Sequence, residues 1–309
     1  MLSFNKSDRA IAMVKGGEHK GKIVYYHDKK DPNLRIPAPL ERYADHSKFC
    51  RGRNILSEKE IDKILQYINT DNLPDDVTDD ELLRIFADTR ESAISRNFME
   101  LKLNEGEFVI LPYEKPNQVE IIYLTGPKGS GKSTSCRRYA DTYKVYFPEN
   151  RVFLISRKEE DPILDDAGFI TRIAVDDTFL EGEPLGPKDF TDSLVIFDDI
   201  ESISNKKLKE AVYQLKNDLM MTGRSENVYV MSVAHVGCNG HDTKIDLTEA
   251  DAFITYDNNT PHHLERLLTV YGGLDKHQFK RVRDLKSRWV FTHKSRPRYI
   301  IGEKDVILL

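Results

Sequence analysis

Short apolar runs recur along the later part of the chain and predict a series of buried β-strands. They cover residues 119–124, 151–156, 193–197, 228–234 and 252–256, and polar or turn residues bound each run. Runs of about four to eight apolar or β-branched residues are typical of strands buried on both faces, as in parallel sheets. Helical patterns fill most of the intervals, which indicates βαβ units. The expected fold class is therefore α/β, with a mainly parallel central sheet flanked by helices.

The first 118 residues differ from the rest, because their apolar runs are shorter and their loops carry several prolines. Residues 10–26 place two β-type runs around a glycine-rich turn, which predicts a hairpin in a small barrel. The glycines and lysines there resemble the KOW element of small nucleic-acid-associated β-barrels, and an ordinary hairpin fits the same residues. We expect a smaller α+β accessory region over 1–118 and a second domain over 119–309.

Two capping boxes predict helices within the accessory region. A hydroxyl side chain and a carboxylate three residues later satisfy the free amides at a helix start. The segments SEKE at 57–60 and TDDE at 78–81 have this spacing. Helices near 58–68 and 79–92 should follow.

Composition and charge describe an ordinary globular protein. Hydrophobic residues make up 39% of the chain, and the net charge of -5 argues against a wholly basic nucleic-acid coat protein. The 3 cysteines, Cys50, Cys136 and Cys238, form no CxxC pair, so neither a disulfide framework nor a thiolate zinc site is expected. No apolar run approaches the roughly 20 residues that span a bilayer. We therefore expect a soluble, intracellular protein without a membrane span.

The segment GPKGSGKS, residues 126–133, lies between the first predicted strand and a helix expected from Thr134 to about Lys144. It satisfies the P-loop pattern GxxxxGK[ST], the Walker A motif, in its strand–loop–helix context. Its glycines let backbone amides curl around phosphate oxygens, and the helix directs its positive end at them. Lys132 should reach the β- and γ-phosphates, and Ser133 should offer its hydroxyl to magnesium. The expected nucleotide-binding residues are Gly126, Gly129, Ser130, Gly131, Lys132, Ser133 and Thr134.

A second motif, LVIFDD, has the form of a Walker B motif and ends in Asp198 and Asp199. Ligands bind at the carboxyl ends of strands in open parallel sheets. Asp198 should hold magnesium through water, and Asp199 should be the general base that orients and deprotonates the attacking water. Glu201 is a nearby substitute for that role, and an acidic helix N-cap is the alternative for the pair. Since no NKxD-type guanine reader is present, the two motifs indicate a P-loop NTPase that binds ATP and Mg2+.

Two further residues are candidates for the catalytic site. A lysine-rich amphipathic helix is predicted over 206–221, and the strand after it ends at His235. A polar residue at that strand tip can contact the γ-phosphate or the attacking water; a buried histidine bonded to a carbonyl is the alternative. Arg224 lies in the loop before the same strand. In a ring it would be an arginine finger for a neighbouring subunit, contributing roughly 10³ to 10⁵ in rate, and a surface ion pair is the alternative.

The motifs GPKGSGKS, LVIFDD and TGR, with a polar strand tip, resemble those of the packaging ATPases of large nucleocytoplasmic DNA viruses. These are the poxvirus-type virion ATPases within the FtsK-HerA class of ring motors. The resemblance covers about residues 119–260, and the tail beginning at Leu274 also looks similar. The chain departs from the family at Ser225, where a histidine commonly follows the arginine, and at His235, where glutamine is common. These departures bear on the role of His235 as the residue that senses the γ-phosphate or the attacking water more than on the nucleotide site.

The resemblance implies an ATP hydrolase that forms a homo-oligomeric ring and moves double-stranded DNA into a preformed capsid, with a capsid or portal protein as partner. If viral, it would act at a host-cell assembly site or in the virion. A nucleoside or small-molecule kinase shares the P-loop, but no clear lid motif is visible. A virion or scaffold protein that binds ATP only to lock an assembly is a third hypothesis. A terminase that also cuts DNA is disfavoured, because no carboxylate-rich second domain follows residue 260.

Basic residues gather in the C-terminal segment 274–309. Clustered cations suit phosphate contact without base reading; a solvated helix face or an inter-subunit surface is the alternative, and the aromatic residues among them are expected in the core. The segment 155–162 is expected to be a loop at the nucleotide edge of the sheet, with Arg157 or Lys158 contacting phosphate or a neighbour, or exposed. The clustered basic residues are Lys276, Lys280, Arg281, Arg283, Lys286, Arg288, Lys294, Arg296 and Arg298.

Overall fold

One large sheet runs through the protein. The computed structural model describes residues 2–7, 9–27, 99–113, 118–240, 243–257 and 259–309. The parallel strands are β6 (Ile121–Thr125), β7 (Arg151–Ser156), β8 (Ile170–Ala174), β9 (Ser193–Asp198), β10 (Val228–Ala234) and β11 (Ala252–Tyr256). The antiparallel strands are β4 (Glu100–Lys102), β12 (Trp289–His293), β13 (Tyr299–Ile301) and β14 (Asp305–Leu308).

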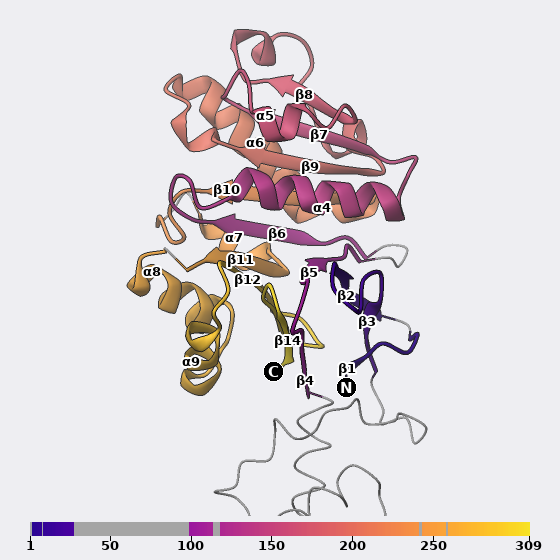
Figure 1. Cartoon of the computed structure of the whole chain (residues 1–309). Coiled ribbons are helices and arrows are strands. Elements are labelled where there is room, and N and C mark those ends of the chain that lie inside the picture. The colour runs from indigo at the N-terminus through magenta and orange to yellow at the C-terminus, as the bar shows by residue number, and fades with distance from the viewer. Residues whose placement is uncertain (1, 8, 28–98, 114–117, 241–242, 258) are drawn as a thin grey trace, which may run out of the picture.

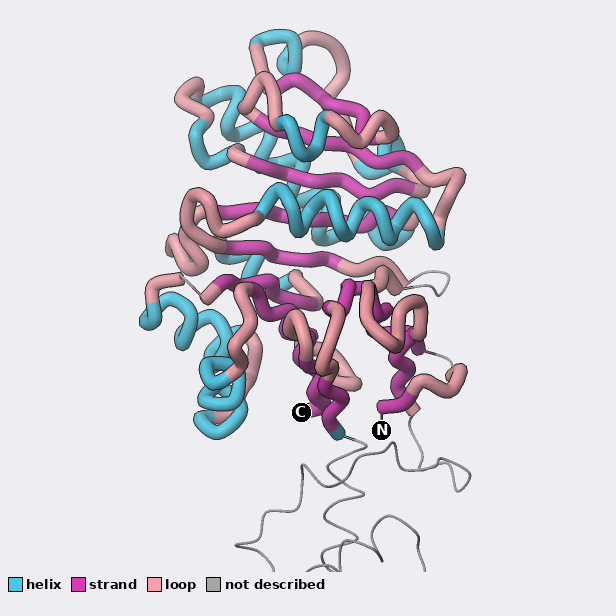
Figure 2. The backbone as a smooth tube through the Cα atoms, viewed as in Figure 1, coloured by secondary structure: helices cyan, strands magenta, loops and turns pink. Residues whose placement is uncertain are grey.

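The strand order of this 10-stranded sheet is β4-β14-β13-β12-β11-β6-β10-β9-β7-β8 (Figure 1, Figure 2). From β11 to β8 every neighbouring pair is parallel, whereas β12, β13, β14 and β4 extend the other side antiparallel. This confirms the predicted α/β fold with a mainly parallel central sheet. The five expected strands match β6, β7, β9, β10 and β11 to within two residues. The short runs of β8 and of the antiparallel strands were not predicted.

Side chains alternate between the two faces of the sheet, so each strand contributes to two cores. In β6, Ile122 and Leu124 lie in one core, and Ile121 and Tyr123 lie in the other. Because both sets are buried, the strand is apolar throughout instead of alternating with polar residues.

Helices cover both faces. α4 (Lys132–Tyr146) packs Tyr139 and neighbouring residues into one core, in front of the sheet in Figure 1. α6 (Lys206–Thr222) packs its apolar stripe into the other core, and the Asn205 side chain caps its first amides. Both helices were predicted, with the start or end shifted by up to two residues. The remaining helices are α5 (Pro162–Asp165), α7 (Lys244–Glu249), α8 (Pro261–Arg266) and α9 (Lys276–Asp284).

Short helical turns complete the connections: η2 (Asp177–Leu180), η3 (Pro187–Phe190), η4 (Ile200–Ser202), η5 (Gly223–Glu226) and η6 (Leu267–Tyr271). Among the described residues, no helix combines the length and the apolar character needed to cross a bilayer.

A smaller antiparallel sheet contains β1 (Leu2–Ser3), β2 (Arg9–Lys15), β3 (Ile23–Tyr26) and β5 (Glu107–Ile110), in the order β1-β3-β2-β5. β2 and β3 are the two arms of the predicted hairpin. Gly17 in its turn has a φ of +67°, and a Cβ there would lie 2.8 Å from the carbonyl oxygen of Glu105. The described strands do not close into a barrel, because β1 and β5 remain unpaired with each other. The helices expected near 58–68 and 79–92 lie outside the described residues.

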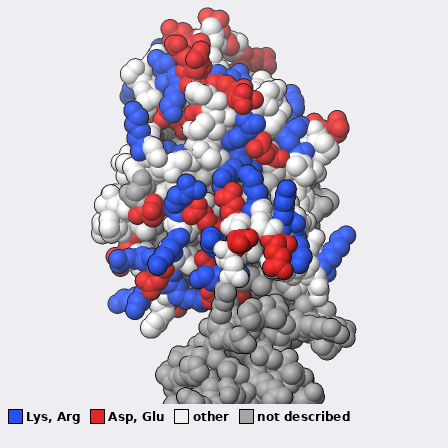
Figure 3. Space-filling view, in the orientation of Figure 1, with Lys and Arg blue, Asp and Glu red and all other residues white. Residues whose placement is uncertain are grey.

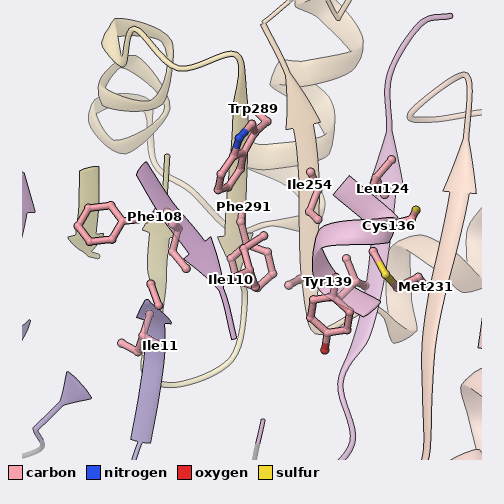
Figure 4. Close-up of a cluster of buried hydrophobic side chains, with 14 of the residues drawn as sticks. Ile11, Phe108, Ile110, Leu124, Cys136, Tyr139, Met231, Ile254, Trp289 and Phe291 are labelled. Carbon is pink, nitrogen blue, oxygen red and sulfur yellow. The ribbon is translucent and has the colours of Figure 1, made fainter. Parts of the chain in front are cut away.

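The small sheet shares a core with α4 and the large sheet. Figure 4 shows Ile11 and Phe108 of the small sheet in the same cluster as Tyr139 and Phe291. The segment 99–113 also contributes one strand, β4, to the large sheet and one, β5, to the small sheet. The boundary near residue 118 stays a prediction, and the buried aromatic residues of β12 and β13 lie in the core as expected.

Candidate functional site: a P-loop at the carboxyl edge of the sheet

The strand order brings four distant segments to one edge of the sheet. β10 lies between β6 and β9, and β7 lies on the other side of β9. These strands are parallel, so their carboxyl ends face the same way. The loops that leave these ends carry the P-loop, Lys158, the Asp198–Asp199 pair and His235. The candidate site is built from these loops.

The P-loop forms an open cradle of backbone amides at the start of α4. Gly129 and Gly131 have φ angles of +79° and +102°, which favour glycine. A Cβ on Gly129 would meet nothing within 4 Å, so a side chain there would extend into the space beside the loop. α4 begins after Gly131 with no side-chain cap, which leaves the amides of its first turn available to an anion.

The Tyr256 side chain packs against the P-loop. A Cβ on Gly126 would lie 2.6 Å from the Tyr256 ring and 2.8 Å from Ser130 Oγ, so only glycine fits there. The Tyr256 hydroxyl donates to Ser135 Oγ at 2.7 Å. Ser130 Oγ is buried and has no hydrogen-bond partner within the described part of the chain. An orphaned hydroxyl in the cradle fits a ligand with acceptor oxygens.

Lys132 extends over its own loop. Its Nζ donates to the carbonyl oxygens of Gly126 at 2.7 Å and Pro127 at 3.2 Å, and it lies 3.2 Å from His235 Nδ1. Burial lowers the pKa of Lys132, and the nearby Asp198 carboxylate opposes that shift. These contacts hold the ammonium group against the P-loop, next to His235.

Ser133 is held by Asp161, which the motifs do not include. The Ser133 hydroxyl donates to Asp161 Oδ2 at 2.8 Å. The other oxygen of Asp161 accepts from the amides of Ile163 at 3.0 Å and Leu164 at 3.2 Å, which caps α5. Because Asp161 is buried and bonded at both oxygens, it fixes the direction of the Ser133 hydroxyl.

Asp198 and Asp199 have different environments. Burial raises the pKa of Asp198, and the neighbouring Asp199 charge adds to that shift. Burial also opposes ionisation of Asp199, but hydrogen bonds from Lys158 and His235 outweigh it and hold its pKa below the usual range. Lys158 Nζ lies 2.5 Å from Asp199 Oδ2. Asp199 is therefore the more firmly ionised of the pair.

His235 connects Lys132 to Asp199. Its Nε2 lies 2.9 Å from Asp199 Oδ1, and its backbone amide donates to Glu201 Oε2 at 3.2 Å. If Lys132 donates to Nδ1, the proton on the ring is at Nε2 and is donated to Asp199. The side chain is 41% exposed, so it is not a buried core histidine.

The structure leaves Arg224 at the opposite edge of the sheet. It lies in η5, just before the amino end of β10, and lines a cavity of about 470 Å³ with Glu120 and Asp251. The seven residues of β10 place roughly 20 Å between the two edges. Lys132, Asp199 and His235 are thus brought together, and Arg224 is separate from them within one subunit.

The residues at the cradle fit a magnesium ion that arrives with a nucleotide. Mg2+ is usually bound by one or two carboxylates together with substrate phosphates and water. Ser133 and Asp198 supply the oxygen ligands expected of the protein. In the described ranges, no three acidic, histidine or cysteine side chains enclose a metal site by themselves. Ser133 and Asp198 therefore suit a Mg2+ ion whose other ligands would be phosphate oxygens and water.

Several basic side chains of the C-terminal segment are engaged within the protein. Arg281 and Arg288 form ion pairs with Glu100 at 2.9 Å and Glu303 at 2.7 Å. Arg298 donates to a backbone carbonyl at 3.0 Å. On the face shown in Figure 3, basic and acidic side chains are intermingled. DNA contact by this segment stays a prediction.

Comparison with known proteins identifies a viral relative. No protein-family model matches the chain. The chain is 38% identical over 207 residues to "Uncharacterized protein V3" of Sputnik virophage, a match that covers 66% of this chain and 82% of that protein. The chain belongs to the V3 family.

Solved structures share part of the fold of this V3-family chain. The genome packaging NTPase B204 of Sulfolobus turreted icosahedral virus 2, in complex with ATP-gammaS, is 18% identical with a TM-score of 0.39, covering 60% of this chain and 97% of that chain. The DNA-packaging ATPase B204 of Sulfolobus Turreted Icosahedral Virus is 17% identical with a TM-score of 0.42, covering 60% and 98%.

Two site residues of this V3-family chain were missed or left open by the motifs. Asp161 was not singled out, although an aspartate directly before Pro162 has the form of a helix N-cap. Lys158 was one of two candidates in its loop, with exposure as the alternative. The signal available for both was their place after the second parallel strand, because the carboxyl ends of parallel strands lie at the same edge of the sheet as the P-loop.

Proposed function

We propose that the protein is an ATP-hydrolysing motor that moves double-stranded DNA into a preformed capsid. The observation that carries the hydrolase assignment is the meeting of Lys132, Asp199 and His235 in one hydrogen-bonded chain beside the P-loop cradle. The DNA-packaging assignment rests on the order of the motifs. It places the chain with the poxvirus-type ATPases of the FtsK-HerA class, and a relative in a virophage supports a viral origin.

The protein's own groups have separate tasks in this proposal. The amides of the P-loop and of the first turn of α4 bind the β-phosphate, and Lys132 moves from the loop carbonyls to the phosphate oxygens. Ser133 and Asp198 would hold Mg2+, which supplies charge neutralisation for the phosphates. Asp161 orients the Ser133 hydroxyl for that contact.

Asp199 is suited to orienting the attacking water more than to removing its proton. Its low pKa makes it a weak base, while its oxygens are fixed by Lys158 and His235. Positioning of the nucleophile is the main requirement in phosphoryl transfer. His235 would then sense the γ-phosphate through Lys132 and Asp199. Glu201 supports the backbone of His235, which is a structural contact distinct from the base role considered for it.

A hollow beside the P-loop favours water over a larger acceptor. It has a volume of about 110 Å³ and is lined by Pro127, His235, Asn259 and His263, among others. Small-molecule sites usually measure about 300 to 1,000 Å³. Transfer to a nucleoside or sugar is therefore disfavoured, and hydrolysis is the better-supported reaction.

Arg224 requires a neighbouring subunit to act on the phosphates. It lies at the amino ends of the strands, so it cannot reach the P-loop of its own chain. A homo-oligomeric ring would place one subunit's amino edge against the next subunit's nucleotide. The capsid or portal partner and the assembly site or virion location belong to the same proposal.

The test is ATP turnover by the purified chain with and without duplex DNA. We expect DNA to stimulate turnover, and stimulation to fall steeply with salt because phosphate contacts release counter-ions. Lys132→Ala should lower turnover by about 10²- to 10³-fold, with and without DNA. Turnover that is indifferent to DNA at all salt concentrations would leave a hydrolase without the motor function. Nucleotide binding without any turnover, unchanged in Asp199→Asn, would instead favour the scaffold hypothesis.

A further inference from the structure

Lys158 reaches into the site from the loop after β7. Its Nζ lies 2.5 Å from Asp199 Oδ2, 3.7 Å from Asp198 Oδ2 and 4.0 Å from Asp161 Oδ2. The three carboxylates come from two different strand ends, and their side chains are nearly buried. The ammonium group is therefore the point on which they converge.

The charges in this cluster do not balance. Lys158 contacts the three carboxylates and the Lys132 charge also acts on Asp198, so the group is formally left with one uncompensated negative charge. Buried carboxylates are costly unless a cation or hydrogen bonds compensate them. A divalent cation would compensate the group better than the single charge of Lys158 does.

The backbone of Lys158 is anchored, and its side chain reaches Asp199 from a partly exposed position. The Lys158 amide donates to Ser156 Oγ at 3.2 Å, and its carbonyl accepts from Arg172 at 2.8 Å. Arg172 is held in turn by a bidentate contact with Asp165. The Lys158 side chain is 47% exposed. It can therefore swing into solvent by rotation about its own bonds, without opening the core.

We propose that Lys158 is a tethered counter-ion of the magnesium site, which neutralises the Asp198–Asp199 pair and is displaced when Mg2+ enters with the nucleotide. This inference rests on the proposed nucleotide site. It makes Lys158 a positioning residue: it holds the carboxylates in place, and it lowers the affinity of the site for metal that arrives without nucleotide.

The experiment measures metal binding by the full chain without nucleotide. Mn2+ is titrated into wild type, Lys158→Met and Lys158→Arg, and free Mn2+ is followed by electron paramagnetic resonance. Lys158→Met should bind Mn2+ about tenfold more tightly, equivalent to about 1.4 kcal/mol. Lys158→Arg keeps the charge and should resemble wild type. Lys206→Met, which removes a lysine from an exposed ion pair with Glu210, is the charge-matched control and should also resemble wild type.

Thermal unfolding gives an independent readout. In a chelator, Lys158→Met should melt below wild type, and excess Mg2+ should raise its melting temperature more than that of wild type. Equal or weaker Mn2+ affinity in Lys158→Met, or no binding by any variant, would overturn the proposal. Binding of a slowly hydrolysed ATP analogue to wild type is measured separately. If that binding is absent, the nucleotide site itself is refuted, whereas normal binding with an unchanged Lys158→Met refutes only the counter-ion role.

Discussion

The two edges of the parallel sheet both carry charged residues but use them differently. At the carboxyl edge, Lys132, Lys158, Asp199 and His235 come from separate loops and contact one another at a partly exposed surface. At the amino edge, the charged groups lie around a cavity of about 470 Å³ where the small sheet meets the large one. There Glu120 is buried, accepts from the Tyr139 hydroxyl at 2.8 Å and lies 3.9 Å from His293 Nε2.

The difference shows what each edge contributes. The carboxyl-edge groups hold each other in contacts that a triphosphate and a metal ion can replace. The amino-edge groups are fixed by packing, and their protonation is shifted by burial: the pKa of Glu120 is raised to about 7 and that of His293 is lowered to about 4. We therefore expect substitutions at the carboxyl edge to change turnover more than stability. Substitutions at the amino edge should do the reverse.

The largest effect is expected for Lys132→Ala. Removing the cation that contacts the phosphates should lower ATP turnover by about 10²- to 10³-fold, as for the loss of one transition-state donor. Stability should stay close to wild type, because the hydrogen bonds of Lys132 in the described part of the chain are with its own loop carbonyls and His235. Turnover and urea unfolding are measured on the same preparation. A large loss of stability would contradict the expected difference between the two edges of the sheet.

Asp199→Asn should have the next largest effect. The amide keeps the size of the side chain but loses the charge that Lys158 and His235 contact, so we expect turnover to fall about 10²-fold. Nucleotide binding, measured with a fluorescent ATP analogue, should be retained. Glu201→Gln is the matched control and should cost much less, because the side-chain carbonyl oxygen of the introduced glutamine can still accept from the His235 amide. Equal losses in the two variants would move the water-orienting role away from Asp199.

Glu120→Gln tests the amino edge through the pH dependence of stability. Burial raises the pKa of Glu120 in the folded protein, from 4.5 to about 7. The folded state therefore binds this proton more tightly than the unfolded state. The Glu120 contribution to the stability of wild type should be lost as the pH rises from about 4.5 to about 7, by roughly 2 to 3 kcal/mol, and the loss persists above that range. Glutamine carries no such charge, so its advantage over glutamate should grow across the same window.

The measurement is urea unfolding of wild type and Glu120→Gln from pH 5 to pH 8. His293 provides an internal reference: burial and the nearby Arg9 charge lower its pKa to about 4. The His293 contribution to stability should therefore be lost in both proteins as the pH falls from about 6.5 toward 4. This contribution is opposite in sign to that of Glu120, so the stability difference between the two proteins isolates Glu120. Turnover of Glu120→Gln at pH 8 should match wild type. A stability difference that is constant with pH would show that burial does not raise the pKa of Glu120.

The sequence predicted the parallel strands well because burial on both faces makes them continuous apolar runs. β7 and β10 are found with the expected bounds. β8 was missed because it is the outermost strand of the sheet and is half exposed, with Arg172 in its middle. The antiparallel strands β12 to β14 were missed because they contain only 5, 3 and 4 residues and lie among basic residues. Such short buried runs are hard to recognise in a charged segment.

Within the candidate site, the sequence predicted the parts that belong to motifs. The P-loop, Asp198 and Asp199 have fixed spacing along the chain, so pattern alone singles them out. Asp161 and Lys158 depend on which strand lies beside β9, and that neighbour is set by the strand order of the folded sheet. Arg224 was predicted as an arginine finger for a neighbouring subunit, and a strand length separates it from the P-loop of its own chain.

The smallest effect is expected for Asp161→Asn, which separates site chemistry from stability at one residue. Asparagine caps a helix about as well as aspartate, so the amides of Ile163 and Leu164 keep their partner and stability should not change. The Ser133 hydroxyl then faces a neutral group, and we expect the Mg2+ concentration for half-maximal turnover to rise about tenfold, as for other groups that orient metal ligands. Asp161→Ala removes the cap as well and should also lose about 1 kcal/mol of unfolding free energy. If Asp161→Asn were destabilised as much as Asp161→Ala while its Mg2+ requirement stayed unchanged, Asp161 would be a structural cap alone, and the carboxyl edge would lose one of its functional groups.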